Sequence, residues 1–369
     1  MKILRLFNSP GPTSAPYNQF SLGLANKTEQ TICTLFPPSL IVEKSLKYSH
    51  GGGSLFKMIK ILRRLISEND YDVIHIHSGH TGLALLLSLT PYNLFLLKRV
   101  VFTLHTSYNL LSLRNKLLVT LAMFFSSKVC PCGESSRDSI PVFIRRLIEK
   151  KISMIVNGFN HDKVDNVRAN KNSNELFTRD CGIKLVCVGA LNDNKNQISL
   201  LKAIKNLKIS GELVFLGDGA NRASLESYSK EVNSEISVKF EGRVSRDVAI
   251  SYMLEADVLI SLSKGEGMPI SVLEAIYSGC FTILSDIPPH KEISPLENTC
   301  IFVSTTQNKE IVNALNYVDK NISSVRGEGV LSSEYVLKNY SLESMLGNYY
   351  NIYCELSRTN TKHLKKVKN

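Results

Sequence analysis

The chain has 369 residues, of which 43% are hydrophobic and 21% are charged. This composition is typical of a globular protein and excludes a disordered or fibrous one, and the length predicts two domains of about 150–200 residues each. The net charge of +11 is unevenly placed, because residues 1–150 hold 18 Lys/Arg against 8 Asp/Glu and residues 357–369 add five basic residues and no acidic one.

Short apolar runs alternate with helical patterns in the first half of the chain. The runs predicted as buried strands are residues 1–7, 31–36, 72–78 and 99–105. The predicted helices are residues 57–66 and 115–125. Basic helical stretches such as 57–66 are either core-packed helices with a solvated face or a contact with an anionic membrane surface. Nucleic acid is not an expected partner, because the basic residues are not interleaved with aromatic ones and the chain has no Trp.

Three features favour a cytoplasmic protein. The first ten residues do not resemble a signal peptide. The longest apolar region, residues 82–97, is broken by Pro91 and is shorter than the roughly 20 residues that a membrane span requires. The eight cysteines are scattered and sit mostly in apolar runs, as in a reducing compartment. We therefore expect a cytoplasmic protein. If the basic helices contact a membrane, it would be the inner face of the cell membrane, with the protein held there peripherally.

The second half of the chain repeats the alternation of strands and helices. Its predicted strands are residues 184–190, 211–219, 237–243, 256–263 and 280–286, and its predicted helices are residues 196–207, 220–232, 245–256 and 270–279. Strand–helix alternation predicts an α/β protein whose parallel sheets are covered on both faces. The polar, Asn-rich residues 161–180 are predicted to form a linker and an early loop of the second domain.

Ligands of such open sheets bind beyond the carboxyl ends of the strands. The segments that follow the strands are therefore the candidate site: Asn8–Ala15, His77–Gly79, His105–Tyr108, Ala190–Lys195, Gly217–Arg222, Gly242–Arg243, Lys264–Glu274 and Asp286–Glu292.

The segment 263–280, SKGEGMPISVLEAIYSGC, carries two carboxylates, Glu266 and Glu274. The turn before Pro269 is a helix start, whose free N–H groups bind anions. Carboxylates beside an anion site fit a ligand that is part polyol and part anion, such as a nucleotide sugar. Ser271 and Glu274 also fit a capping box, in which the glutamate only closes the helix start. The local sequence leaves both interpretations of Glu274 open.

Other polar residues at the strand ends can be interpreted either as solvated or structural residues or as functional ones. Lys195 is either a solvated loop lysine or a phosphate ligand. His105 is either a structural strand-end histidine or a site residue. His75, His77 and His80 resemble a metal cluster, but no nearby carboxylate or thiol completes it, so zinc is not expected.

Four ordered motifs resemble those of the retaining glycosyltransferases of family 4, which have the two-domain GT-B fold. They are VNGFN (156–160), VGALNDNKNQ (188–197), FLGDGANRASLE (215–226) and EGMPISVLEAIYSG (266–279). The resemblance implies two doubly wound Rossmann-like domains that face each other across a cleft. Residues 1–160, with the closing helices 341–369 packed back on them, would form the acceptor-side domain, and residues 161–340 would bind the donor.

The resemblance also implies roles for individual residues. Glu266, Lys195 and His105 would be the catalytic residues, with Glu266 at the donor sugar, Lys195 at the diphosphate and His105 at the sugar and leaving group. Glu274 would bind the nucleotide ribose. The donor-binding residues are expected to be Glu274, Gly267, Met268, Pro269, Ile270, Ser271, Gly189, Gly217, Arg243 and Gly11.

The implied activity is transfer of a sugar from a UDP- or GDP-sugar to a glycan or lipid-linked saccharide, with retention and without a metal or other cofactor, in bacterial capsule or lipopolysaccharide synthesis. One departure from the family is Ala190, which stands where the family has an arginine, so Lys195 or Arg243 would carry more of the diphosphate charge. The alternatives are a sugar-nucleotide epimerase or hydrolase on the same fold, and an inactive nucleotide-sugar-binding scaffold at the membrane.

Overall fold

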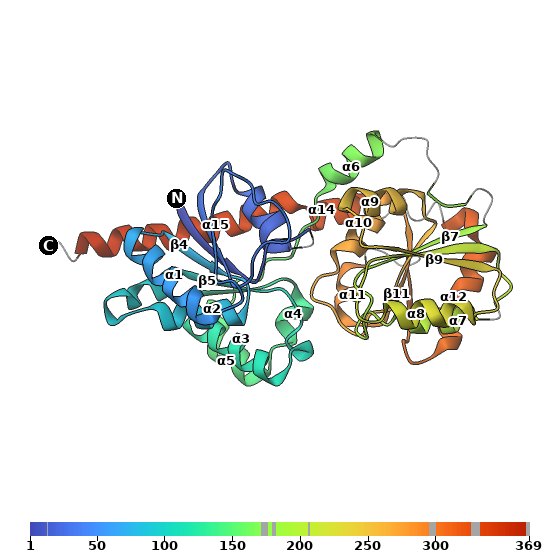
Figure 1. Ribbon diagram of the computed structural model, residues 1–369, viewed down its shortest axis with the longest axis horizontal. Coiled ribbons are helices and arrows are strands. Elements are labelled where there is room, and N and C mark those ends of the chain that lie inside the picture. The colour runs from blue at the N-terminus through green and yellow to red at the C-terminus, as the bar shows by residue number, and fades with distance from the viewer. Residues whose placement is uncertain are drawn as a thin grey trace. The chain divides into compact units, whose positions relative to one another are not determined.

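Figure 1 shows the computed structural model of the chain. The structure describes residues 1–12, 14–170, 176–178, 182–205, 207–294, 300–325 and 333–366, with side chains as far as residue 357. Two compact units form the chain, Met1–Val156 together with Glu343–Asn369, and Asn157–Leu342. The division falls after residues 156 and 342, where the sequence predicted 160 and 340.

The first unit is built on a parallel sheet. Its strands, in spatial order, are β3 (Lys47–His50), β2 (Glu29–Thr34), β1 (Lys2–Phe7), β4 (Val73–Ile76), β5 (Val100–Leu104) and β6 (Lys128–Pro131). The four predicted strands are present, and the two edge strands β3 and β6 were not predicted. They are only four residues long, and β3 is nowhere fully buried, so neither carries a long apolar run. The chain order reverses direction between β1 and β4, which makes this pair the switch point of the sheet.

Helices cover both faces of this sheet. They are η1 (Pro16–Ser21), α1 (Leu55–Glu68), α2 (Gly79–Ser88), η2 (Pro91–Arg99), η3 (Tyr108–Leu110), α3 (Leu113–Phe125), α4 (Glu134–Asp138), α5 (Val142–Ile148), η4 (Glu149–Lys151) and α15 (Leu342–Lys366). The predicted helix 57–66 begins earlier because the Ser54 hydroxyl accepts a hydrogen bond from the Lys57 N–H and caps it. Helix α2 was not predicted, since it is apolar along most of its length and lacks the helical alternation of apolar and polar residues.

The second unit has a parallel sheet of the same design. Its strands, in spatial order, are β12 (Cys300–Val303), β11 (Phe281–Ser285), β10 (Val258–Ser261), β7 (Ile183–Val188), β8 (Gly211–Leu216) and β9 (Ile236–Gly242). Here the order reverses between β7 and β10. The five predicted strands are all present, and β12 was not predicted. The expectation of two doubly wound parallel sheets is confirmed.

The helices of the second unit are α6 (His161–Ala169), α7 (Gln197–Ile204), α8 (Arg222–Lys230), α9 (Arg246–Glu255), α10 (Ile270–Ser278), α11 (Pro288–Ile293), α12 (Asn308–Lys320) and α14 (Ser333–Asn339). Helices α9 and α10 pack together on one face, and α7 packs against α8 and α12 on the other (Figure 1). The face that α7, α8 and α12 cover holds a core of branched and aromatic side chains to which all six strands contribute, β12 through Val303.

The prediction of a linker at residues 161–180 is wrong for its first half, which forms α6. Asn160 caps this helix, because its Oδ1 accepts a hydrogen bond from the Lys163 N–H, and Val164 is fully buried beneath it. A single buried apolar residue among polar ones gives no visible helical pattern. Residues 171–175 and 179–180 of the predicted linker lie outside the described residues.

Candidate functional site

The loops after β7 and β10 meet at the switch point of the second sheet. Lys195 follows β7 and Glu266 follows β10, and Lys195 Nζ lies 2.5 Å from Glu266 Oε1. The backbone N–H of Lys264 donates to the Asn194 carbonyl at 2.7 Å, and Asn194 Nδ2 donates to the Gly265 carbonyl at 2.8 Å. Adjacency of β7 and β10 therefore brings together two residues that are 71 positions apart, and the two loops are hydrogen-bonded to each other.

Two glycines allow the loops after β7 and β8 to approach closely. Gly189 and Gly217 have φ of 147° and 149°, a conformation that other residues rarely adopt. A Cβ atom on Gly217 would lie 1.9 Å from the Gly189 carbonyl oxygen, and one on Gly189 would lie 3.2 Å from Lys195 Cε. Gly189 thus adjoins Lys195, and Gly217 adjoins Gly189, both in a geometry that favours glycine.

Glu274 is almost fully buried on α10 and forms an ion pair with Arg246 at the start of α9. Arg246 Nε donates to Glu274 Oε1 at 2.7 Å, and Arg246 Nη2 contacts Oε2. Burial raises the pKa of the Glu274 carboxyl, while the Arg246 guanidinium opposes this shift. A carboxylate offers about four acceptor positions, so a bidentate arginine leaves some of them for another donor.

The capping-box interpretation of Ser271 and Glu274 is wrong. The residue before α10 is Pro269, no side chain caps the helix, and the Glu274 carboxylate is directed to Arg246 instead. Glu274 therefore has no local role in starting the helix, and the ligand-contact interpretation is the one left open.

The remaining predicted donor-binding residues divide by position. Gly267, Met268 and Pro269 are buried in the loop after β10, and Ile270 and Ser271 are partly exposed in the first turn of α10. Arg243 is exposed directly after β9. Gly11 belongs to the other unit, where it follows β1 and its carbonyl accepts a hydrogen bond from Asn18 Nδ2 at 2.9 Å.

His290 lies beside the second unit's site and was not singled out from the sequence. It is fully buried on α11, with Nδ1 3.0 Å from Ser285 Oγ, and burial lowers its pKa. The Ser285 hydroxyl donates to the Ser263 carbonyl at 2.6 Å, directly before the loop that carries Glu266. The sequence signal for His290 was its position in the strand-end segment Asp286–Glu292. A histidine next to two prolines does not by itself indicate a buried site residue.

In the first unit, His105 follows β5 and is partly exposed beside a cavity of about 240 Å³. Its Nε2 lies 2.8 Å from His77 Nδ1, and His77 in turn lies next to Arg5. Burial, with a smaller contribution from the Arg5 guanidinium, lowers the pKa of His105 to about 4. The ring is therefore neutral near pH 7.

The histidine pattern of β4 does not build a metal site. In the described part of the chain, no three His, Cys, Asp or Glu side chains are grouped to hold a metal ion. Arg5 Nη1 lies 3.0 Å from His75 Nδ1 and 3.2 Å from His77 Nε2, so a cation already occupies the position between the two rings. His80 is not part of this group of hydrogen bonds.

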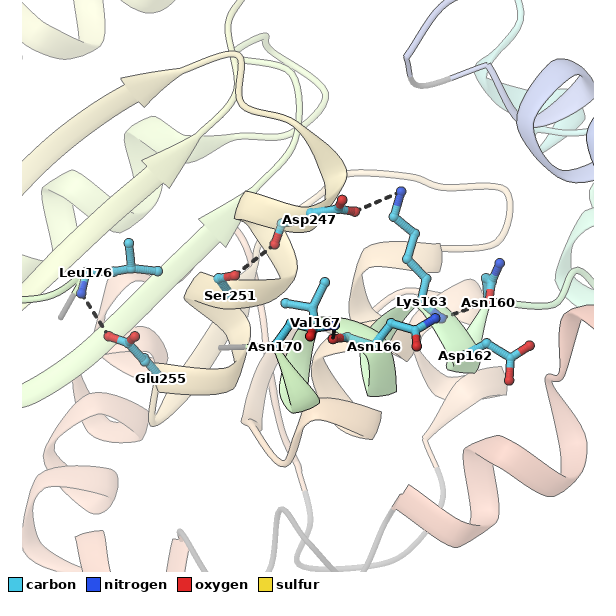
Figure 2. A pocket seen from close by; sticks show the side chains of 10 residues that line it. All are labelled: Asn160, Asp162, Lys163, Asn166, Val167, Asn170, Leu176, Asp247, Ser251 and Glu255. Carbon is cyan, nitrogen blue, oxygen red and sulfur yellow. Dashed lines mark hydrogen bonds and ion pairs between the residues drawn. The ribbon is translucent and has the colours of Figure 1, made fainter. Parts of the chain in front are cut away.

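A larger cavity of about 650 Å³ lies between α6 and α9 of the second unit (Figure 2). Figure 2 shows Lys163 of α6 directed at Asp247 of α9, and the two side chains are 2.8 Å apart. Most of its lining residues are polar or charged and come from these two helices. It contains none of the predicted site residues.

Comparison with known proteins supplies two family matches. The model described as glycosyl transferases group 1 matches residues 169–324, and the model described as Glycosyltransferase Family 4 matches residues 29–163. The two matches fall on the second and the first sheet. Among the described residues no helix is long and apolar enough to cross a membrane.

Curated relatives are similar over a large part of the chain. The capsular polysaccharide biosynthesis glycosyltransferase CapH of Staphylococcus aureus is 27% identical, and the alignment covers 65% of this chain and 65% of CapH. The UDP-Gal:α-D-GlcNAc-diphosphoundecaprenol α-1,3-galactosyltransferase of Escherichia coli is 25% identical over 81% of this chain and 80% of its own. The match to CapH thus spans just under two thirds of that relative.

Solved structures share the fold. HepE of Anabaena in complex with UDP has a TM-score of 0.75 at 17% identity, covering 96% of this chain and 100% of HepE. Sucrose-phosphate synthase of Thermosynechococcus elongatus has a TM-score of 0.77 at 16% identity, covering 97% of this chain and 100% of its own. The expected GT-B class of fold is confirmed by these similarities.

Proposed function

Since the chain belongs to the family 4 glycosyltransferases, we propose that it transfers a sugar from a UDP-sugar to a lipid-linked saccharide, with retention of anomeric configuration. The observation that carries the proposal is the Lys195–Glu266 pair at the switch point of the second sheet. Parallel α/β sheets bind ligands at this place, and a cation next to a carboxylate matches a donor that is part diphosphate and part polyol.

The choice of uridine rests on the relatives. The name of the Escherichia coli relative specifies UDP-Gal, and HepE was solved with UDP and with UDP-glucose. The choice of acceptor rests on two relatives whose names specify undecaprenol-linked saccharides, one from Escherichia coli and one from Campylobacter jejuni. CapH adds capsular polysaccharide as the kind of product.

Each site residue then has a separate task. Lys195 leaves Glu266 to contact the donor diphosphate, and the Glu266 carboxylate is released to accept hydroxyl hydrogen bonds from the sugar. Glu274 accepts hydroxyl hydrogen bonds from the ribose at the positions that Arg246 leaves unused. Gly189 and Gly217 have no side chains that would fill the space beside Lys195 and between the two loops, so the diphosphate can reach Lys195.

The proposed reaction needs no metal. Lys195 and the N–H groups at the start of α10 would stabilise the negative charge that develops on the departing diphosphate. The bond between the anomeric carbon and the phosphate oxygen breaks while the acceptor oxygen bonds to the same face, and the acceptor proton passes to the leaving phosphate. Activity that persists in the presence of EDTA supports this part of the proposal, and activity restored only by a divalent cation contradicts it.

We place the membrane contact on α3 and α5 of the first unit, which pack against each other. Exposed apolar side chains lie on both helices, at exposures of 85% for Leu113, 70% for Leu117, 68% for Phe143 and 69% for Leu147. Exposed basic residues are close to them in sequence: Arg114 on α3, Arg146 on α5 and Lys150 on η4, which follows α5. Apolar side chains interspersed with basic ones fit an anionic lipid surface, where a lipid-linked acceptor is found.

The test is a transfer assay with purified protein, a panel of UDP-sugars and undecaprenyl-diphosphate-linked saccharides in detergent, with the product linkage determined by NMR. The proposal predicts an α-linked product from an α-linked UDP-sugar. Inversion at the anomeric carbon, or release of free sugar or of an altered nucleotide sugar without acceptor, contradicts it. Glu266→Gln and the exposed Glu235→Gln form the matched pair of variants, of which only the first is expected to lose most of its activity.

A further inference from the structure

The guanidinium of Arg5 and the imidazole rings of His77 and His105 form a series of contacts that ends at His105. Arg5 of β1 is completely buried, and its Nη1 lies 3.2 Å from His77 Nε2. His77 Nδ1, on the other side of the same ring, lies 2.8 Å from His105 Nε2. Arg5 is on β1 and His77 directly follows the adjacent strand β4, at the switch point of the first sheet. The end of this series of contacts is the partly exposed His105 beside the 240 Å³ cavity.

The donors and acceptors of this series of contacts can be assigned from Arg5 alone. A guanidinium only donates hydrogen bonds and stays charged, so His77 Nε2 must be the acceptor. A neutral ring with an accepting Nε2 carries its hydrogen on Nδ1, and His77 Nδ1–H then donates to His105 Nε2. His105 Nε2 is thereby an acceptor, and the hydrogen of the neutral His105 ring must be on Nδ1.

Arg5 also contacts His75, whose donors and acceptors can be assigned in the same way. His75 Nδ1 lies 3.0 Å from Arg5 Nη1 and 2.6 Å from the Tyr353 hydroxyl, and His75 Nε2 lies 2.8 Å from Thr103 Oγ1. With Nδ1 accepting, His75 Nε2–H donates to Thr103. Both buried histidines beside Arg5 are therefore neutral, and burial lowers the pKa of each well below the ordinary value.

We propose that Arg5 and His77 are positioning residues that hold His105 as a neutral ring with its hydrogen on Nδ1, so that His105 donates a hydrogen bond to a saccharide oxygen in the 240 Å³ cavity of the first unit. This inference rests on the proposed function for its substrate and on the geometry of the first unit for its tautomer. His105 then acts as a hydrogen-bond donor in the transfer and takes no part as a base, since the lone pair of Nε2 is engaged by His77.

The groups that face this series of contacts come from five elements. Arg5 is on β1, His75 is on β4 beside His77, Thr103 is on β5, and Tyr349 and Tyr353 are on α15. The ring of Phe20, from η1, packs edge-on against His75, His77 and His105. Arg5 carries the fixed positive charge of this set, and both tyrosines have a raised pKa, first of all because they are buried.

The tautomer can be measured without any substrate. We suggest long-range ¹H–¹⁵N NMR of the imidazoles of the full chain at pH 7, with the eight histidines assigned by single substitution. The expected spectrum has the Nδ1–H tautomer for both His77 and His105. In Arg5→Met, which removes the fixed donor and charge, the His77 ring is expected to lose its single tautomer and the pKa of His105 to rise. An Nε2–H tautomer of His105, or a cationic ring at pH 7, in the unaltered protein overturns the proposal.

A pair of substitutions at His77 separates positioning from packing. Asn offers an amide N–H₂ near the position of the imidazole Nδ1, whereas Leu fills the space without a donor. We expect His77→Leu to lower kcat by about tenfold, as for loss of one hydrogen bond, and His77→Asn to restore most of it, with KM for the UDP-sugar unchanged in both. Equal losses in the two variants, or a loss that appears only in KM, contradict the positioning role.

The two proposals can fail separately. Binding of UDP to the second unit of the His77→Leu variant, followed by calorimetry, reports on the donor site alone. If UDP binds and His105 does not have the Nδ1–H tautomer, the positioning role of Arg5 and His77 is contradicted and the transferase proposal stands. If the tautomer is as expected and no UDP-sugar is used, the role of His105 as a donor to the sugar is contradicted together with the proposed function.

Discussion

Lys195 Nζ and Glu266 Oε1 are 2.5 Å apart at the point where the order of the second sheet reverses. Without a ligand each charge is neutralised by the other, and both side chains are largely buried. A donor that carries both a diphosphate and sugar hydroxyls can replace this ion pair with two sets of contacts. Removal of Lys195 is therefore expected to affect the contact with the diphosphate, and removal of Glu266 the contact with the sugar.

Replacement of Glu266 by Gln is expected to reduce turnover much more than donor affinity. The amide cannot stabilise positive charge at the sugar ring, and the loss of one preorganised electrostatic group costs about 10²–10³ in kcat. Lys195 stays available for the diphosphate, so the dissociation constant for UDP should be unchanged or lower. Steady-state kinetics and calorimetry with UDP measure the two effects, and a parallel loss in both contradicts the assigned role.

Replacement of Arg246 by Met is expected to destabilise the second unit. It leaves the Glu274 carboxylate buried without its partner, which typically costs 3–5 kcal/mol of the free energy of unfolding. The double variant Arg246→Met/Glu274→Gln removes both charges and should recover much of the loss. Chemical denaturation of the two variants and of the parent measures this recovery. A double variant that is no more stable than Arg246→Met would contradict the ion pair as the source of the loss.

Acid is expected to destabilise the first unit between pH 6.5 and pH 4. His105 has a pKa of about 4 in the folded chain against 6.5 for an ordinary histidine, and those of His75 and His77 are lowered as well. Above pH 6.5 the ring is neutral in both states, so it contributes no pH dependence. Below pH 6.5 the unfolded chain binds a proton that the folded chain does not, and the free energy of unfolding falls, by about 2 kcal/mol for His105 alone at pH 5.

Denaturant unfolding at a series of pH values measures this loss, and His105→Gln is the informative variant. It lacks the titrating ring, so its stability should fall less steeply over the same window. A variant that keeps the full pH dependence would show that other groups cause it.

The apolar patch of α3 and α5 predicts the behaviour of the protein on vesicles. Phe143→Ser together with Leu147→Ser should reduce sedimentation with vesicles that contain anionic lipid, because burial of each side chain in the interface contributes about 1.5–3 kcal/mol. Tyr317→Ser, at an exposed aromatic residue of α12 in the second unit, is the control. Sedimentation that does not depend on the patch, on anionic lipid or on salt would contradict a membrane contact at these helices.

The alternation of elements could be predicted from the sequence because buried parallel strands are continuous apolar runs, as in residues 184–190 and 211–219. Elements without such a run were missed. Edge strand β3 is polar, α6 buries only Val164, and α2 has no polar face. Observed helix starts differ from the predicted ones by one to a few residues where a serine or asparagine cap, such as Ser54, lies outside the apolar pattern.

The positions of the candidate site residues at the strand ends could be predicted, but their pairings could not. The strand-end rule and the motif resemblance placed Lys195, Glu266 and Glu274, yet each was given a ligand contact of its own. The pairing of Lys195 with Glu266, and of Arg246 with Glu274, depends on which strands are neighbours and on where α9 and α10 pack. Arg5 was read only as part of an apolar strand, because nothing in MKILRLF indicates that its guanidinium is buried against two histidines.

The most direct measurement is thermal unfolding of the metal-free protein in the presence of UDP, GDP, ADP and their common sugar conjugates, for the unaltered chain, Lys195→Met and Lys202→Met. Lys202 is an exposed lysine of α7 and serves as the control. We predict stabilisation by UDP and UDP-sugars, about 2.7 kcal/mol at a hundredfold excess over the dissociation constant, that Lys195→Met loses and Lys202→Met keeps. Stabilisation by GDP in place of UDP would contradict the choice of donor, and the absence of any shift, or one that persists in Lys195→Met, would contradict the site itself.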